Sequence, residues 1–407
     1  MAASAVSYRE LFAIPHLPGL MFWALAGRLH LTCTSLAITF LVAGWTGSYT
    51  LAGVVAGALT VCQSVAGPWR GRSADRGHGV RLVVLTSLGY AAGLAGLAAL
   101  PAWVPPTGWP LAVALAAVTG LALPPVNQIA RASWSRLAPT ELRDSVYTVD
   151  ATLQELLFVA GPMAVAATVA LAGPAHGTLL VAGVVLVGGV GFAGMMRRTR
   201  LGVPLPVAPL TPLVRRRSVL AEPGLAGLIV VMALLVGGLM ATDLAIIAWA
   251  RDRGQPFLAG VLAAVWAIGS LLGGLVAGAR STAAPPRLGL RLGAVLAGMV
   301  VLVAVLAGVP SPVLLGVVLF FAGTAIAPAL GAVYGGIAQR APEHRRAEAF
   351  GWQSTASMAG MALAAPTAGA CLDRIGPAGG AAVAALALAL AVVIVTAPGA
   401  ASVAGRG

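Results

Sequence analysis

Long apolar runs recur along the whole sequence, and they restrict the fold more than any other feature. The runs at 179–195 and 292–309, for example, contain no charged residue. At 1.5 Å per residue, a helix of about 20 residues crosses a hydrocarbon core about 30 Å thick. The runs do not alternate in polarity, as the strands of a membrane barrel do. With 59% hydrophobic and 9% charged residues, the chain is also too apolar for a soluble domain. The sequence therefore predicts an all-α membrane protein.

The basic residues are distributed in a way that is typical of membrane topology. The net charge is +13, and all 25 basic residues are arginines that lie mostly in short connections between apolar runs. We therefore attribute the charge to the positive-inside rule and expect no nucleic-acid partner. The 3 cysteines lie inside apolar runs without metal-ligand spacing, and the sequence has no phosphate-binding loop or hydrolase motif. We expect neither a metal, nor a cofactor, nor enzyme activity.

Charged, Pro-rich and Gly-rich punctuation divides the chain into twelve expected helical spans. The expected spans are 18–43, 48–68, 80–101, 109–134, 145–172, 176–196, 223–249, 256–279, 288–308, 312–338, 348–372 and 377–397. An even number of spans places both termini on one side of the bilayer, and the arginine-rich connections identify that side as cytoplasmic. The N-terminal run is too long for a signal peptide. We expect a multi-pass protein of the cell (inner) membrane with both termini in the cytoplasm.

The two halves of the chain repeat short segments at nearly constant offsets. The segment LAGV at 51–54 recurs at 258–261, and the pattern A-P-x-x-x-R at 138–143 recurs at 341–346. Repetition of this kind indicates a duplicated unit, and we expect two pseudo-symmetric six-helix bundles. A Pro-rich stretch midway along the chain is typical of a tether. The expected units are 1–198 for the first bundle, 199–222 for the cytoplasmic linker, and 223–407 for the second bundle.

The connection between the second and third spans reads GRSADRGHGVR and contains Gly71, Asp75, Arg76 and Arg81. It resembles the cytoplasmic signature of the major facilitator superfamily, G-x-x-x-D-R-x-G-R-R, although its ending differs from that pattern. The number of spans and the position of the mid-chain linker also resemble those of this family. The resemblance implies a transporter that works by alternating access, with spans 1, 4, 7 and 10 around a central cavity. It also implies that the Asp75 carboxylate binds the N-terminus of the eleventh span, near residues 348–350. A solvated loop that only sets the topology is the alternative.

Ionisable side chains within predicted spans are costly, and they are the candidates for proton coupling. Arg28 lies in the first span, Asp150 and Glu155 in the fifth, and Asp243 in the seventh. Asp150 and Glu155 are separated by about 140° around a helix, so Arg28 is expected to pair with only one of them. We expect Glu155, near mid-membrane and beside Arg28, to carry the proton, with Asp150 and Asp243 as the alternatives. A permanent arginine–carboxylate bridge with no part in transport is the competing explanation.

Two further motifs bear on the direction of transport. Gly161-Pro162 in the fifth span resembles part of the antiporter signature of drug exporters, but Ala164 and Val165 stand where that signature has glycines. Helix packing alone can also account for a Gly-Pro pair. In the fourth span, Asn127 and Arg131 are four residues apart and are expected at the cytoplasmic mouth of the cavity. Snorkelling of Arg131 to the membrane surface is equally compatible with its position.

The sequence predicts proton-coupled export of a small, rather lipophilic molecule by a monomer in the lipid bilayer. The small number of polar residues within the spans disfavours a sugar-type site. Two alternatives stay open, which are proton-coupled or facilitated uptake of a small metabolite and a membrane receptor or scaffold that transports nothing.

Overall fold

The computed structural model describes residues 8–201, 218–255, 257–279, 288–308 and 311–396, and within these ranges all regular elements are helices. The first half of the chain contains α1 (Tyr8–Phe12), α2 (Leu17–Arg28), α3 (His30–Thr46), α4 (Tyr49–Val65), α5 (Gly67–Ser73), η1 (Ala74–His78), α6 (Gly79–Trp103), η2 (Pro106–Gly108), α7 (Trp109–Leu121), α8 (Val126–Leu137), η3 (Thr140–Leu142), α9 (Arg143–Ala172) and α10 (Pro174–Arg198). The second half contains η4 (Val219–Ala221), α12 (Leu225–Asp252), α13 (Phe257–Ala279), α14 (Leu288–Ala307), α15 (Pro312–Gly323), α16 (Ile326–Arg340), η5 (Glu343–Arg345), α17 (Arg346–Ile375) and α18 (Pro377–Thr396).

The expected membrane spans are present as helices. Among the described residues, 11 helical segments are long and apolar enough to cross a membrane, and α4 adds a shorter apolar helix of 17 residues. Because α4 leads almost directly into α5, the two together form the second expected span. The prediction of an all-α polytopic membrane protein is confirmed.

Several spans are interrupted near their middle, which the hydropathy pattern did not predict. The fourth span is divided into α7 and α8 at Pro124 and Pro125, and the tenth into α15 and α16 shortly before Pro328. Proline lacks an amide donor and cannot continue an α-helix without losing a backbone hydrogen bond. Pro125 and Pro328 occupy equivalent places in the two halves of the sequence. The paired breaks therefore agree with the internal repeat.

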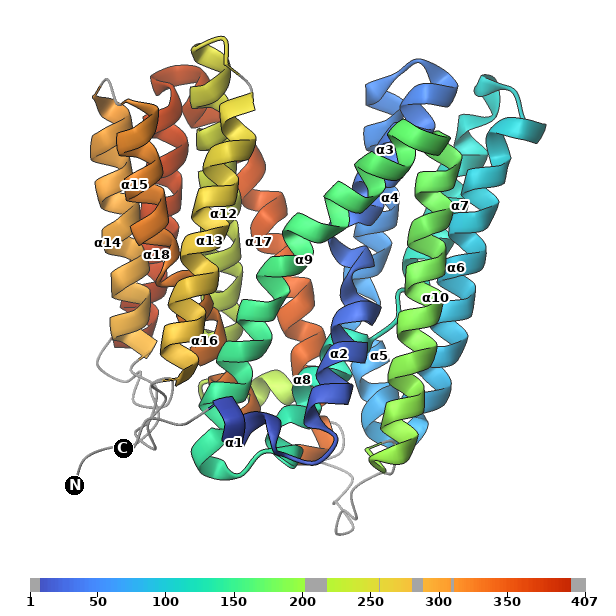
Figure 1. The fold of residues 1–407 in the computed structure, drawn as a ribbon, viewed down its shortest axis with the longest axis horizontal. Coiled ribbons are helices and arrows are strands. Elements are labelled where there is room, and N and C mark those ends of the chain that lie inside the picture. The colour runs from blue at the N-terminus through green and yellow to red at the C-terminus, as the bar shows by residue number, and fades with distance from the viewer. Residues whose placement is uncertain (1–7, 202–217, 256, 280–287, 309–310, 397–407) are drawn as a thin grey trace.

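The helices form two groups that meet at one end of the molecule (Figure 1). Helices α2–α10 lie in one group and α12–α18 in the other, and their ribbons diverge toward the upper end of the view. We call the lower end, formed by α1, η1 and η5, the basal end. The expected linker lies mostly at 202–217, outside the described residues. The domain limits at 198 and 223 stay a prediction.

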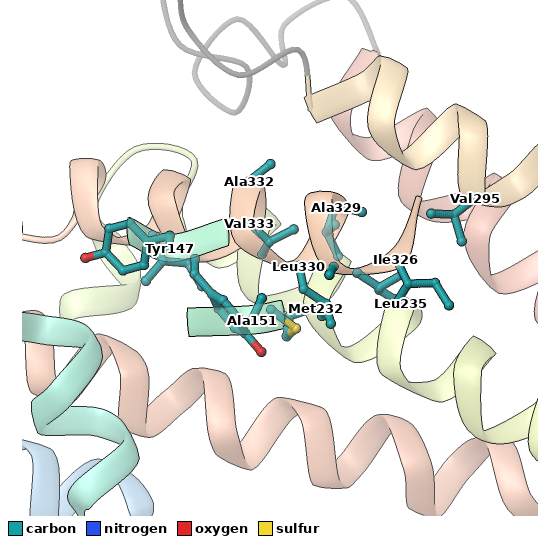
Figure 2. Packing of buried hydrophobic residues seen from close by; sticks show 14 of the residues in the cluster. Tyr147, Ala151, Met232, Leu235, Val295, Ile326, Ala329, Leu330, Ala332 and Val333 are labelled. Atoms are coloured by element: carbon teal, nitrogen blue, oxygen red, sulfur yellow. The ribbon is translucent and has the colours of Figure 1, made fainter. Parts of the chain in front are cut away.

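Hydrophobic packing crosses between the two groups near the basal end. Tyr147 and Ala151 of α9 belong to the same buried cluster as Leu330 and Val333 of α16 (Figure 2). The backbones approach closely there, because a Cβ atom placed on Gly331 would lie 2.7 Å from the Cα of Thr148. Small residues allow membrane helices to pack at this distance. The resulting contact holds α9 against the opposite group and positions its polar residues at the interface.

Candidate functional site

Asp150 lies at the centre of a buried group of charges in the first half of the chain. Its Oδ1 accepts a hydrogen bond from Arg28 Nη1 at 2.7 Å, and its Oδ2 accepts one from Arg131 Nε at 3.1 Å. The side chains are only 1% exposed for both arginines and 3% for Asp150. Charge-assisted bonds to both carboxylate oxygens offset part of the large cost of removing these ions from water. We call Arg28, Arg131 and Asp150 the central triad.

Arg131 connects the central triad to the other half of the molecule. Its Nη2 donates to Gln154 Oε1 at 2.6 Å, and its Nη1 donates to Gln353 Oε1 of α17 at 3.2 Å. The guanidinium carbon lies 3.6 Å from the ring centroid of Tyr334 on α16, which is a cation–π contact. Tyr147 donates from its hydroxyl to the Arg131 backbone carbonyl at 2.8 Å. Arg131 therefore spans the interface and is held from both sides.

The central triad corrects two expectations from the sequence. Arg28 pairs with Asp150, so the expectation that Arg28 lies beside Glu155 is wrong in this conformation. Arg131 is 1% exposed, so neither snorkelling nor a place at an open cavity mouth describes it. Asn127 also lies at the start of α8, and its Oδ1 is buried without a hydrogen-bond partner among the described residues.

Sequence reasoning missed Gln353 and Tyr334, although both contact the central triad. They carry no charge and come from the opposite half of the chain. A search of the spans for polar residues able to bind a guanidinium is the signal that could have found them.

Glu155 and Asp243 differ from Asp150 because neither has a bonded partner among the residues that the structure describes. Glu155 on α9 and Asp243 on α12 are both partly buried. Within the described parts of the chain, no hydrogen bond or ion pair reaches either carboxylate, but the two lie close enough to interact electrostatically. They come from opposite halves of the chain. No arginine is therefore bonded to Glu155 or Asp243 within the described residues, so a proton can bind to either carboxylate without displacing an arginine.

At the basal end, Asp75 binds the N-terminus of α17. Its Oδ1 accepts a hydrogen bond from the backbone N–H of Ala347 at 3.1 Å, and its Oδ2 accepts one from Glu348 at 2.9 Å. The carboxylate thus satisfies two amides that have no partner within their own helix, and it gains from the helix dipole. Arg72 adds a bond from its Nε to Glu348 Oε1 at 2.8 Å. The contact that the resemblance implied is present.

Of the remaining signature residues, one packs against α17 and the other two are exposed. Gly71 packs against the backbone of Ala347, and a Cβ atom on Gly71 would overlap the Ala347 carbonyl oxygen. Arg76 and Arg81 are exposed. Gly71 and Asp75 of the signature therefore touch the other half of the molecule.

Gly161 and Pro162 lie inside α9 and do not end it, since the helix continues to Ala172. Gly161 faces α3, where a Cβ atom would lie 3.3 Å from the Cβ of Cys33. Thr32 of α3 donates to the Leu157 carbonyl at 2.8 Å. The Gly-Pro pair thus lies in a close contact between α9 and α3.

The family model for the Major Facilitator Superfamily matches residues 20–365. The chain belongs to the Major Facilitator Superfamily. Proteins of this superfamily are secondary transporters without enzyme activity, so the protein is a transporter that moves a small-molecule substrate.

Solved structures of other superfamily members share the fold with this one. A bacterial homologue of the iron transporter ferroportin in its outward-facing state is 17% identical, with a TM-score of 0.76 over 93% of this chain and 97% of that chain. The human organic anion transporter MFSD10 is 17% identical, with a TM-score of 0.63 over 96% of this chain and 100% of that chain. The proton:xylose symporter XylE is 13% identical, with a TM-score of 0.70 over 93% of this chain and 95% of that chain. No curated protein matched the sequence.

Proposed function

We propose that this superfamily member exports a small, rather lipophilic molecule across the cell membrane in exchange for protons. The basal end faces the cytoplasm in this proposal, because arginine is concentrated in the basal connections. The described basal arginines include Arg72, Arg76, Arg81, Arg143, Arg345 and Arg346. At the opposite end the described arginines are Arg251, Arg253 and Arg374. In this orientation the two halves are closed on the cytoplasmic side and diverge on the outer side (Figure 1).

The carboxylates of Glu155 and Asp243, which have no bonded partner within the described ranges, are the observation that carries the proposal. Like charges that approach each other in a low dielectric repel, and a bound proton removes that repulsion. Protonation at this pair therefore favours the approach of α9 and α12. Because α9 and α12 belong to opposite halves, a proton bound there changes the balance between conformations, which is what coupling to a gradient requires.

Asp150 is a weaker candidate for the moving proton. Its two oxygens are already bound by Arg28 and Arg131, so a proton must compete with two charge-assisted hydrogen bonds. Asp150 holds the centre of the interface together in our proposal, and the Asp75 contact closes the basal end.

Transport by everted membrane vesicles tests the proposal, because their basal ends face the bath. The vesicles contain the full chain and are given an acidic interior by a rapid pH shift. Three membrane-impermeant naphthalene derivatives serve as anionic, neutral and cationic probes. Accumulation of one of them that depends on the pH gradient supports export. Loss of a preloaded probe driven by the same gradient indicates uptake in the cell, and no movement in either direction argues against proton coupling.

A further inference from the structure

Arg28 has an unused hydrogen-bonding edge in the middle of the molecule. Only its Nη1 is bonded, to Asp150, whereas its Nε and Nη2 are buried and have no partner among the described residues. The whole side chain is 1% exposed, so bulk water does not satisfy these two donors in this conformation. Buried donors without partners are rare in proteins and costly, because the desolvation of each is not repaid.

The charges of the central triad do not balance. Two guanidiniums share the single carboxylate of Asp150, and the other groups that contact Arg131 are the neutral side chains of Gln154, Gln353 and Tyr334. One positive charge is therefore left over in a buried place. A buried charge is stable only when it is paired and hydrogen-bonded, so the triad calls for one more negative group.

The geometry of the unused edge indicates which negative group fits. Nε and Nη2 are the two donors along one edge of the planar guanidinium, and they match two oxygens of a carboxylate, a sulfonate or a phosphate. We propose that the transported substrate is an organic anion whose carboxylate or sulfonate group binds to the Nε–Nη2 edge of Arg28. This inference rests on the proposed transport function and names the class of its substrate.

The surroundings favour an apolar body on that anion. Gln154 and Gln353 each accept a hydrogen bond from Arg131 with their carbonyl oxygen, and the Tyr147 hydroxyl donates to the Arg131 backbone, so in this conformation these oxygens are not free to accept from hydroxyl groups of a sugar-like molecule. Buried hydrophobic residues of α9, α12 and α16 fill the neighbouring interface (Figure 2). An anion with an aromatic or aliphatic body supplies the missing partner of Arg28 and packs its apolar part against these hydrophobic residues.

Access to Arg28 depends on the conformation. The unused edge is closed to solvent here, while the basal ends of the two halves are in contact. Opening the basal end separates Arg131 from Gln353 and Tyr334, which belong to the other half. In our proposal the anion binds from the basal side when the halves separate there, and it dissociates from Arg28 when the basal end closes.

Isothermal titration calorimetry tests the inference by measuring how tightly the full chain in lipid nanodiscs binds 2-naphthalenesulfonate. The Asp75→Asn variant is used beside the wild type, because a larger basal-open population strengthens the apparent affinity. The neutral 2-naphthalenesulfonamide and the cationic 2-naphthyltrimethylammonium ion are the matched comparison ligands. We expect both to bind at least about tenfold more weakly than the sulfonate, as the loss of a charge-assisted bond predicts.

Substitution of the arginine adds a second measurement. Arg28→Gln is expected to weaken sulfonate binding at least about tenfold, and Arg28→Lys to weaken it less, because lysine keeps the charge but not the two-donor edge. Arg251→Gln, at an exposed position far from the triad, is the matched control and is expected to bind as the wild type does. If Arg28→Gln does not fold, the wild-type preference for the sulfonate over the sulfonamide still decides the question.

Equal binding of the three ligands, or undiminished sulfonate binding by a folded Arg28→Gln variant, overturns the inference. Gradient-driven transport of the neutral or cationic probe in place of the anion likewise overturns it, but leaves proton-coupled export standing. Sulfonate binding that depends on Arg28, without any gradient-driven transport, supports the anion site and counts against proton coupling. The two proposals can therefore fail separately.

Discussion

Two carboxylates on the same helix differ in their surroundings, and the difference assigns them different roles. Asp150 is bound by two arginines, whereas Glu155, a little over one turn further along α9, has no bonded partner among the described residues. A carboxylate without a fixed cation can change its charge at lower cost than one inside a triad. We therefore separate a proton-carrying role for Glu155 from a structural role for Asp150.

Glu155→Gln should abolish accumulation driven by a pH gradient and should spare exchange of substrate between the two sides. Glutamine keeps the size of the side chain but cannot bind and release a proton. Gradient-driven uptake into everted vesicles and counterflow without a gradient measure the two activities. Glu141→Gln, at an exposed position, serves as the control. Normal uphill transport by Glu155→Gln, together with its loss in Asp243→Asn, would assign the proton to Asp243.

Asp150→Asn should destabilise the protein by about 3–5 kcal/mol, because it leaves two buried guanidiniums without their anion. Thermal unfolding in nanodiscs, followed by tryptophan fluorescence, measures the loss. Asp144→Asn is the matched control, since its bridge to Arg291 involves side chains that are 14% and 23% exposed, and the expected loss there is smaller. Similar melting temperatures for wild type and Asp150→Asn would show that the triad contributes nothing to stability.

At the scale of helices, the contact between η1 and α17 closes the basal end, and a single substitution can weaken it. The Asp75 carboxylate interacts with the helix dipole of α17, an interaction that contributes about 0.3–2 kcal/mol. Asp75→Asn should therefore increase the population with an open basal end several-fold. Pulsed electron–electron double resonance between spin labels at positions 81 and 343, in a cysteine-free background, should record a longer distance in Asp75→Asn than in the unsubstituted protein. Arg76→Gln, which alters an exposed neighbour, should leave that distance unchanged.

The helices were predictable from the sequence to different degrees. Apolar length alone was enough to locate the spans, because the bilayer requires a continuous apolar helix of fixed length. The breaks between α2 and α3 and between α7 and α8 escaped prediction, since membrane helices tolerate proline and glycine and an apolar run does not reveal where its helix is interrupted. The contact of Asp75 with α17 followed from the family resemblance and not from the spacing of residues.

The partners of the buried charges were less predictable than the helices. Spacing along α9 indicated that Arg28 pairs with one of two carboxylates, but the choice depends on how α2 and α9 are rotated against each other. Gln353 contacts Arg131 from a position 222 residues away in the sequence, on the other half of the molecule. Contacts of this kind follow from the assembly of the two halves, which no local pattern describes.

For the whole molecule, alternating access requires the two ends to move in opposite directions. Labels at Tyr49 and Phe257, which are 78% and 67% exposed and are the first residues of α4 and α13, report the separation of the halves at the upper end. Asp75→Asn should shorten this distance while it lengthens the basal one, because each half moves largely as a rigid body. Unequal changes, with a longer basal distance and an unaltered upper one, would indicate local fraying of η1 instead.

The orientation in the membrane follows from the distribution of arginine. In intact cells, a single cysteine at position 49 should react with a membrane-impermeant maleimide, and one at position 343 should react only after the membrane is permeabilised. Labelling at 343 in intact cells, with position 49 protected, would reverse the orientation and place the Asp75 contact at the outer face of the membrane.

The donors that Asp75 uses on α17 are backbone amides, and this has a genetic consequence. Every residue except proline supplies the same N–H at positions 347 and 348, so a substitution there removes this bond only if it introduces proline or a side chain too large for the buried position. Loss-of-closure mutations are therefore expected to include most replacements of Asp75 and Gly71, whereas at Ala347 small residues are expected to be tolerated and large residues or proline are not. The acceptor of this bond can thus be removed by many substitutions of one side chain, whereas its donor N–H groups are removed only by proline, so a random mutagenesis screen would assign the bond mainly to Asp75.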